Sequence, residues 1–124
     1  MKIIISNASQ EPIYQQISDQ VKHLILKGEL EAGQLLPSIR NLAKELQISV
    51  ITTKRAYEEL EREGFIETVG GKGTFVAGQN KELLKEKRLQ LIEEALAEVI
   101  HECKALGISQ DDFIRIIKLL FEEV

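Results

Sequence analysis

Two short helical patterns separated by only two or three residues constrain the fold of this 124-residue chain more than any other feature. Ser38 and Ser49 stand where each pattern begins, and a serine hydroxyl accepts hydrogen bonds from the first free amides of a helix. Because so short a link forces a sharp crossing angle, the two patterns predict a helix-turn-helix unit. The side chains expected to face the core are Leu42, Ala43 and Leu46 on the first helix, and Thr53, Ala56, Tyr57 and Leu60 on the second.

A hairpin signal follows this unit. Residues 65–69 and 74–77 are rich in β-branched and aromatic side chains, and 70–73 between them reads Gly-Gly-Lys-Gly. Two such runs around a glycine turn predict a β-hairpin. The turn is not a phosphate-binding P-loop, because the required spacing and the following helix are absent. Helix, tight turn, helix and hairpin in this order predict a winged helix-turn-helix, in which the hairpin is the wing.

The rest of the chain is expected to be mostly helical. Residues 2–6 alternate weakly and are predicted to form a short edge strand, and Pro12 is expected to open a helix that ends at Gly28. Residues 78–81 resemble a linker. A long helix is expected over 81–106, ended by Gly107, and Ser109 then begins a last helix.

The two C-terminal helices carry apolar residues on one side. In the long helix these residues recur every three or four positions, which is a two-heptad packing pattern. We expect both helices to form a dimer interface. The alternative is that their apolar residues pack on the winged domain of the same chain. The fold class is therefore mainly α with a small β-hairpin, with a winged helix-turn-helix domain over 1–78 and two dimerisation helices over 79–124. The predicted dimer contacts are Leu89, Ile92, Leu96, Val99, Cys103, Phe113, Ile117 and Leu120.

The charge of the chain is uneven. A net charge of −4 argues mildly against nucleic-acid binding. Residues 36–57, however, contain four basic side chains against a single acidic one, Glu45. A local positive patch on a weakly acidic protein is typical of specific binding to one polyanion. The four basic residues are Arg40, Lys44, Lys54 and Arg55.

The composition also argues against disulfides, membrane spans and a signal peptide. The single cysteine excludes an internal disulfide framework, and no apolar run approaches the 18 residues of a membrane span. The first six residues are far too few for a signal peptide. We therefore expect a soluble, cytoplasmic protein with no membrane partner.

The start of the second helix of the unit is suited to DNA. Helical spacing leaves Val50, Ile51, Lys54 and Glu58 most exposed there, and the helix dipole favours phosphate at that end. Basic residues on exposed helix faces are usually only a solvated surface, so alone they are weak evidence of DNA binding. Two helices and a hairpin in this order are much more specific evidence than any one of the three elements. The residues at this end are Ser49, Val50, Ile51, Thr52, Lys54 and Arg55, with Arg40 near the start of the preceding helix and Lys72 at the hairpin tip.

A family resemblance rests on five segments. Residues 12–17, 28–30, 36–43, 56–64 and 71–76 closely resemble the winged-helix domain of GntR-type bacterial transcription regulators. The resemblance covers about 12–76, and the short helical tail resembles the YtrA-type branch of that family, whose members dimerise through two C-terminal helices. It implies a homodimer that binds a palindromic operator on double-stranded DNA, usually as a repressor.

The resemblance also implies DNA contacts. Arg40 matches the family arginine of the second helix, and Val50 stands where the family commonly has an arginine. Loss of that arginine removes a guanine contact worth about 1–3 kcal/mol of discrimination, and Val50 and Ile51 are able to contact thymine methyl groups instead. Thr53 replaces a common valine, and its hydroxyl can bond the preceding turn. The remaining matched positions are Ser49, Thr52, Lys54, Gly71 and Lys72.

The sequence favours no other chemistry. Glu94, Glu98 and His101 share one helix face, but a solvated acidic face is the simpler explanation, so we predict no metal and no cofactor. Cys103 is expected to be a buried apolar residue and His23 to be partly buried. No catalytic signature is present, so an enzyme is not expected. The alternative function is a winged-helix protein-interaction module without specific DNA binding, and a small-molecule effector remains open as a further partner.

Overall fold

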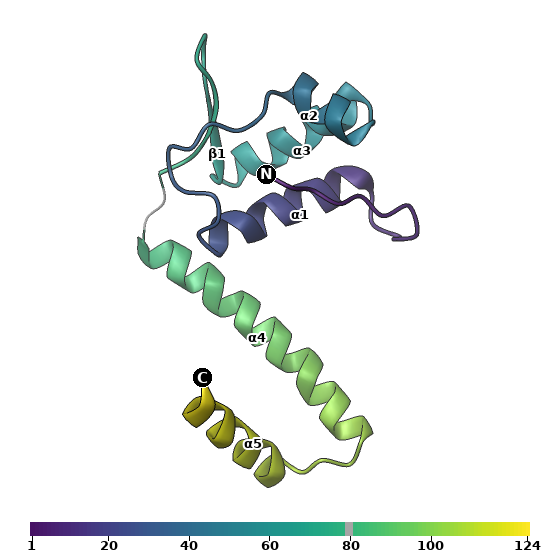
Figure 1. Cartoon of the computed structure of the whole chain (residues 1–124), viewed down its shortest axis with the longest axis vertical. Helices are drawn as coiled ribbons and strands as arrows, with labels where there is room; N and C mark the ends of the chain where they lie inside the picture. The colour runs from purple at the N-terminus through teal and green to yellow at the C-terminus, as the bar shows by residue number, and fades with distance from the viewer. Residues whose placement is uncertain (79–80) are drawn as a thin grey trace. The chain divides into compact units, whose positions relative to one another are not determined.

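The computed structural model of the chain describes residues 1–78 and 81–124 (Figure 1). These residues form two compact units, Met1–Leu84 and Lys85–Val124. The predicted fold class, mainly α with a hairpin, is confirmed. The predicted linker includes residues 79–80, which lie outside the described residues, and the division at 78/79 stays a prediction. The elements are α1 (Ile13–Leu26), α2 (Ile39–Leu46), α3 (Val50–Arg62), β1 (Ile66–Val69), β2 (Gly73–Val76), α4 (Lys81–Ala105) and α5 (Gln110–Glu123).

Both helices of the helix-turn-helix unit begin where the serine caps predict. The hydroxyl of Ser38 accepts a 3.1 Å hydrogen bond from the amide of Asn41, and that of Ser49 accepts one of the same length from Thr52. Between the helices, Gln47 takes the left-handed conformation with φ 56°. Its amide and that of Ile48 bond to carbonyls in the last turn of α2, so the chain reverses within three residues.

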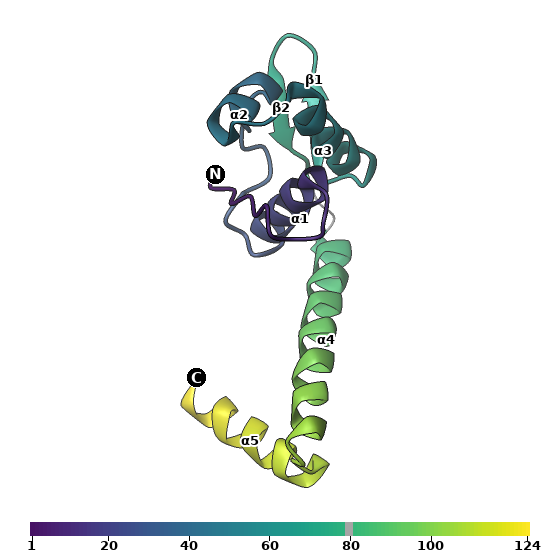
Figure 2. The ribbon, with the colours of Figure 1, turned by 90° about the vertical axis from the view of Figure 1, so that its right-hand side faces the viewer.

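The core of the first unit lies between α1, α2, α3 and the hairpin. Helix α1 packs on α3 along most of its length, and α2 crosses α3 near its start (Figures 1 and 2). The residues predicted to face inward from α3 are all buried. Leu42 and Ala43 of α2 are also buried, while Leu46 is half-buried. The largest side chains with less than 2% exposure are Ile17, Leu42, Leu60, Val21, Val76, Thr53 and Ser18.

The wing is a two-stranded antiparallel hairpin with an added segment. Ile66 pairs with Val76 and Val69 with Gly73, which leaves a three-residue turn. Residues 33–36 run beside β2, where the amide of Leu36 donates to the carbonyl of Thr74 at 2.8 Å. The sequence does not reveal this third extended segment, because residues 33–36 are too few to show an alternating pattern.

The N-terminal segment is not a strand, so the edge strand predicted over 2–6 is wrong. Its backbone groups bond instead to two glutamine side chains of α1. Gln20 accepts from the amide of Ile4 at 2.9 Å and donates to its carbonyl at 2.7 Å. Gln16 makes the same pair of bonds with Ser6, at 2.8 and 3.1 Å. Side-chain amides thus take the place of a neighbouring strand, and Ile3 in this segment is buried.

The second unit consists of most of α4 together with α5. The amide of Ile108 donates to the carbonyl of Cys103 at 2.8 Å across Gly107, which ends the long helix region. The hydroxyl of Ser109 accepts from the amide of Asp112 at 3.2 Å and so caps α5. No residue of α5 is buried. In the described part of the chain, no helix has the length and apolar character needed to cross a lipid bilayer.

Candidate nucleic-acid interface

The first turn of α3 presents an exposed surface. Val50 is 47% exposed and Ile51 is 81% exposed, although both are β-branched apolar residues. Lys54 and Glu58 lie on the same face and are exposed, as the helical spacing predicted. The amino group of Lys54 and the carboxylate of Glu58 approach to 3.9 Å, an open ion pair that leaves the cation accessible. Apolar and cationic groups therefore meet at the helix start, where the dipole also favours an anion.

Three hydroxyls order this first turn. The hydroxyl of Ser49 donates to that of Thr52 at 2.8 Å while accepting from the Thr52 amide. Thr53 is fully buried, and its hydroxyl donates to the carbonyl of Ser49 at 3.1 Å. The polar group that replaces the family's common valine is thus satisfied within the helix, as expected. Ser49 is exposed and Thr52 is half-buried, so both retain access to a ligand at the helix start.

Tyr57 ties the two helices of the unit together. Its hydroxyl donates a 2.7 Å hydrogen bond to the carbonyl of Pro37, directly before the Ser38 cap of α2. Burial of the ring, and secondarily the negative charge of Glu45, raises the pKa of this hydroxyl. The phenol therefore stays protonated and remains a donor at neutral pH. Arg40, near the start of α2, is exposed on the element that this bond positions.

The tip of the wing is shaped by glycine. Gly71 has φ 74° and the amide of Lys72 donates to the carbonyl of Val69 at 3.0 Å, which closes the turn. Gly73 has φ 122°, and a Cβ there would lie 3.0 Å from a methyl of Leu35. Gly71 and Lys72 are both exposed at the far end of the hairpin, which projects away from the helices (Figures 1 and 2).

Side chains also brace the hairpin against α3. The amide of Thr68 in β1 donates to the carboxylate of Glu61 at 3.1 Å. Residues 33–36 support the other strand by their backbone bonds. The predicted DNA contacts thus lie on three elements of one compact unit, and all of them except Thr52 are exposed.

Arg55 was placed at the end of α3 suited to DNA, but it was not among the positions matched to family contacts. Its guanidinium carbon lies 3.8 Å from the centre of the Tyr14 ring, which is a cation–π distance. Spacing alone could not find this pair, because Tyr14 is on α1 and the two residues meet only through the packing of α1 on α3. The sequence indicates a basic residue on an exposed helix, but it does not indicate Tyr14 as its partner.

The predicted dimer contacts lie on α4 and α5, mostly exposed in the single chain. Leu89, Ile92, Leu96 and Val99 are each 42% exposed or more, and so is Leu120. Cys103 is half-buried in the single chain, and its burial in the apolar seam stays a prediction because a second copy is expected to cover that seam. Together with half-buried residues of α5, Cys103 lines a cavity of about 380 Å³ between the two helices. The α5 residues predicted as contacts there are Phe113 and Ile117.

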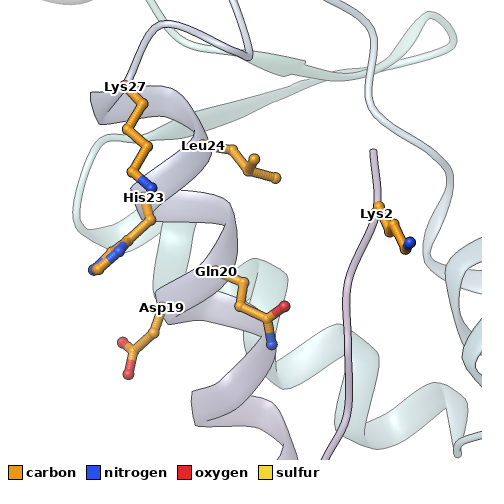
Figure 3. Close-up of a pocket in the computed structure, with 6 residues that line it drawn as sticks. All are labelled: Lys2, Asp19, Gln20, His23, Leu24 and Lys27. Atoms are coloured by element: carbon orange, nitrogen blue, oxygen red, sulfur yellow. The ribbon is translucent and has the colours of Figure 1, made fainter.

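A second hollow lies on α1 (Figure 3). It has a volume of about 300 Å³ beside the N-terminal segment. Gln20 and Leu24 point toward that segment, whereas His23 points away from it (Figure 3). His23 is exposed, so its expected partial burial is wrong: it lies outside the apolar stripe of α1. Among the described residues, no group of three His, Cys, Asp or Glu could hold a metal ion.

Comparison with known proteins identifies the family. Residues 13–76 match the family described as bacterial regulatory proteins, gntR family. The HTH-type transcriptional repressor YtrA of Bacillus subtilis is 38% identical over 98% of this chain and 94% of its own length.

Two solved structures support the same family assignment. A GntR family transcriptional regulator from Listeria monocytogenes has a TM-score of 0.74 and 32% identity, over 92% of this chain and 97% of its own. The DNA-binding domain of AraR, solved in complex with operator ORX1, has a TM-score of 0.55 and 25% identity, over 62% of this chain and 96% of its own. Members of this family regulate transcription by binding DNA and are not enzymes. The chain therefore belongs to the GntR family, and it is a DNA-binding transcription regulator.

Proposed function

We propose that the protein is a cytoplasmic repressor that binds a palindromic operator as a homodimer. The observation that carries this proposal is that the chain combines a winged helix-turn-helix unit with a second, helical unit whose large apolar side chains are mostly exposed. The name of the Bacillus relative, a transcriptional repressor, supports the direction of regulation. A repressor needs only to occupy its operator, which suits a chain of two small units.

The C-terminal helices are the dimer element in this proposal. Leu89, Ile92, Leu96 and Val99 follow the heptad spacing of a packed helix pair, and each is largely exposed in one chain. Helix α5 buries none of its residues. Even its apolar side chains are in water: Phe121 is 83% exposed and Leu119 is 56% exposed. A monomer would leave this apolar surface in water, whereas a second copy would bury it at about 25 cal/mol per Å².

A symmetric dimer suits the DNA-contacting unit as well. Two copies of α3 related by a two-fold axis would enter successive major grooves about 34 Å apart. In each half-site, Ser49, Thr52 and Lys54 would lie at the groove from α3. Arg40 would approach from α2, and the tip of the wing at Gly71 and Lys72 would contact the backbone or the minor groove. A palindromic operator follows from the symmetry of such a protein.

Release by a small-molecule effector is a further part of the proposal. An effector can shift the DNA-bound state only if it binds the free and bound conformations with different affinity. The test is therefore operator affinity measured with and without candidate molecules, since binding alone would not establish regulation.

Two measurements test the central proposal. Selection of bound duplexes from a random pool should yield an inverted repeat with half-sites about one helical turn apart. Sedimentation equilibrium at micromolar concentration should give twice the chain mass. A selected site without two-fold symmetry contradicts the palindrome, and a monomer at micromolar concentration contradicts the dimer.

A further inference from the structure

Helix α3 has three basic residues, and one of them differs from the others in its partner. Lys54 pairs with Glu58 at 3.9 Å, and Arg62 pairs with Glu59. Arg55 has no carboxylate within ion-pairing distance among the residues that the structure describes. Its guanidinium lies instead over the ring of Tyr14, at 3.8 Å. An aromatic face attracts the cation without neutralising its charge.

The position of Arg55 relates it to the DNA-contacting surface. It follows Lys54 directly and lies one helical turn beyond Ile51, the most exposed apolar residue of α3. Residues four apart are neighbours on a helix surface, so Arg55 continues the exposed face along the side of α3 that adjoins α1. Arg55 is itself exposed, whereas Tyr14 is half-buried and fixed by the packing of α1 on α3.

We propose that Arg55 contacts a phosphate of the operator backbone and that Tyr14 is the residue that positions it. A guanidinium has its five N–H donors in one plane. When one face of that plane rests on an aromatic ring, the donors at its edge remain available, and their geometry matches the oxygens of a phosphate. Stacking also restricts a long side chain before DNA arrives, which lowers the entropy lost on binding.

The contact would give α1 a part in DNA binding, whereas the proposed function uses only α2, α3 and the wing for it. Each half-site would be held by Arg55 of α3, positioned by Tyr14 of α1, beside the contacts from α2 and the wing. The inference rests on the proposed function, because it requires α3 to bind duplex DNA. It adds a contact that carries no base specificity, since phosphates are the same in every sequence.

The experiment measures binding of the full chain to the selected operator and to a scrambled duplex by fluorescence anisotropy at several salt concentrations. Arg55→Ala should weaken binding to both duplexes by similar factors. Its slope of log affinity against log salt should fall by about 0.9 for each phosphate that is no longer neutralised, or about two for a dimer. Arg62→Ala is the matched control on the same helix, because Arg62 already pairs with Glu59 and its replacement should leave the slope unchanged.

Variants of Tyr14 test the positioning role. Tyr14→Phe keeps an aromatic face and should bind like the wild type. Tyr14→Leu should weaken binding less than Arg55→Ala, with the salt slope retained, and should have no further effect when Arg55 is already alanine. Thermal unfolding of each variant distinguishes a protein that has lost its fold from a folded protein that binds weakly.

Three outcomes overturn the inference. An Arg55→Ala protein with wild-type affinity and slope removes the phosphate contact. Equal binding by Tyr14→Leu and wild type removes the positioning role. A wild type that binds no duplex removes both this inference and the proposed function, whereas selective wild-type binding with an ineffective Arg55→Ala removes the inference alone.

Discussion

The hydroxyl of Tyr57 and the carbonyl of Pro37 meet across 20 residues of sequence in a 2.7 Å hydrogen bond. The bond joins the middle of α3 to the residue that precedes the cap of α2. It therefore holds Arg40 and the first turn of α3 in one fixed arrangement. A DNA-contacting surface built from two helices depends on such a link, because the turn between them fixes only one end of each.

Removing this bond should lower stability without destroying the fold. Tyr57→Phe keeps the buried ring and leaves the carbonyl of Pro37 without its partner, so we expect a loss of about 0.5–1.5 kcal/mol in the free energy of unfolding. Urea unfolding followed by circular dichroism measures it. An unchanged midpoint would show that water replaces the phenol at no cost.

The same hydroxyl predicts a response to alkaline pH. Burial raises the pKa of Tyr57 above its value in the unfolded chain, which is about 10. Its contribution to stability is therefore fully present below pH 10, and it is lost as the pH rises from there toward the higher pKa of the folded state. The wild type should lose more stability above pH 10 than Tyr57→Phe does. Parallel decline of the two proteins would contradict the raised pKa.

Val50 and Ile51 give a prediction about base preference. Apolar side chains at the start of α3 cannot hydrogen-bond guanine but can contact the methyl group of thymine. Replacing one contacted thymine of the selected operator with uracil removes only that methyl, and should weaken binding by about 0.8 kcal/mol, about fourfold. Uracil placed outside the half-sites is the control, and equal effects at both places would contradict the methyl contact.

The substitution Val50→Arg tests the same position from the protein side. It restores the residue that the family commonly has there, and a bidentate arginine discriminates for guanine by about 1–3 kcal/mol. Repeating the duplex selection with this variant should move guanine into the half-site. Recovery of the wild-type operator by Val50→Arg would place residue 50 away from the bases.

The wing and α2 should differ in how they affect binding. Lys72 lies at the hairpin tip, so Lys72→Ala should weaken all duplexes alike and lower the salt slope by about 0.9 per contact. Arg40→Ala should cost about 1–3 kcal/mol and relax specificity at one position. Titrations of operator and scrambled duplex at two salt concentrations separate the two effects. If neither variant matters, the site assignment is wrong.

Local sequence signals predicted most of the first unit. Ser38, Ser49 and the 70–73 turn act on their nearest neighbours, so their spacing alone located α2, α3 and the wing. The misplaced features depend on groups distant in the chain. The N-terminal segment bonds to Gln16 and Gln20 rather than to a strand, and Arg55 meets Tyr14 only when α1 packs on α3. No periodicity encodes such side-chain contacts.

The apolar face of α4 gives the last prediction. Leu96 is 42% exposed in the single chain and lies in the middle of the heptad pattern, where a symmetric partner would bury two copies of it. Placing a lysine there should cost at least about 3 kcal/mol of dimer stability, about a hundredfold in the dissociation constant. Glu94→Lys introduces the same side chain on the exposed polar part of α4 and serves as the matched control.

Sedimentation of these two variants then tests whether the dimer interface lies on α4. Leu96→Lys should sediment as a monomer at concentrations where Glu94→Lys and wild type are dimers. It should also bind the full operator only as tightly as a half-site, because the second α3 would no longer be held at the correct spacing. A Leu96→Lys protein that remains dimeric would place the interface elsewhere on the chain. A monomer with undiminished operator affinity would show that each copy binds DNA independently.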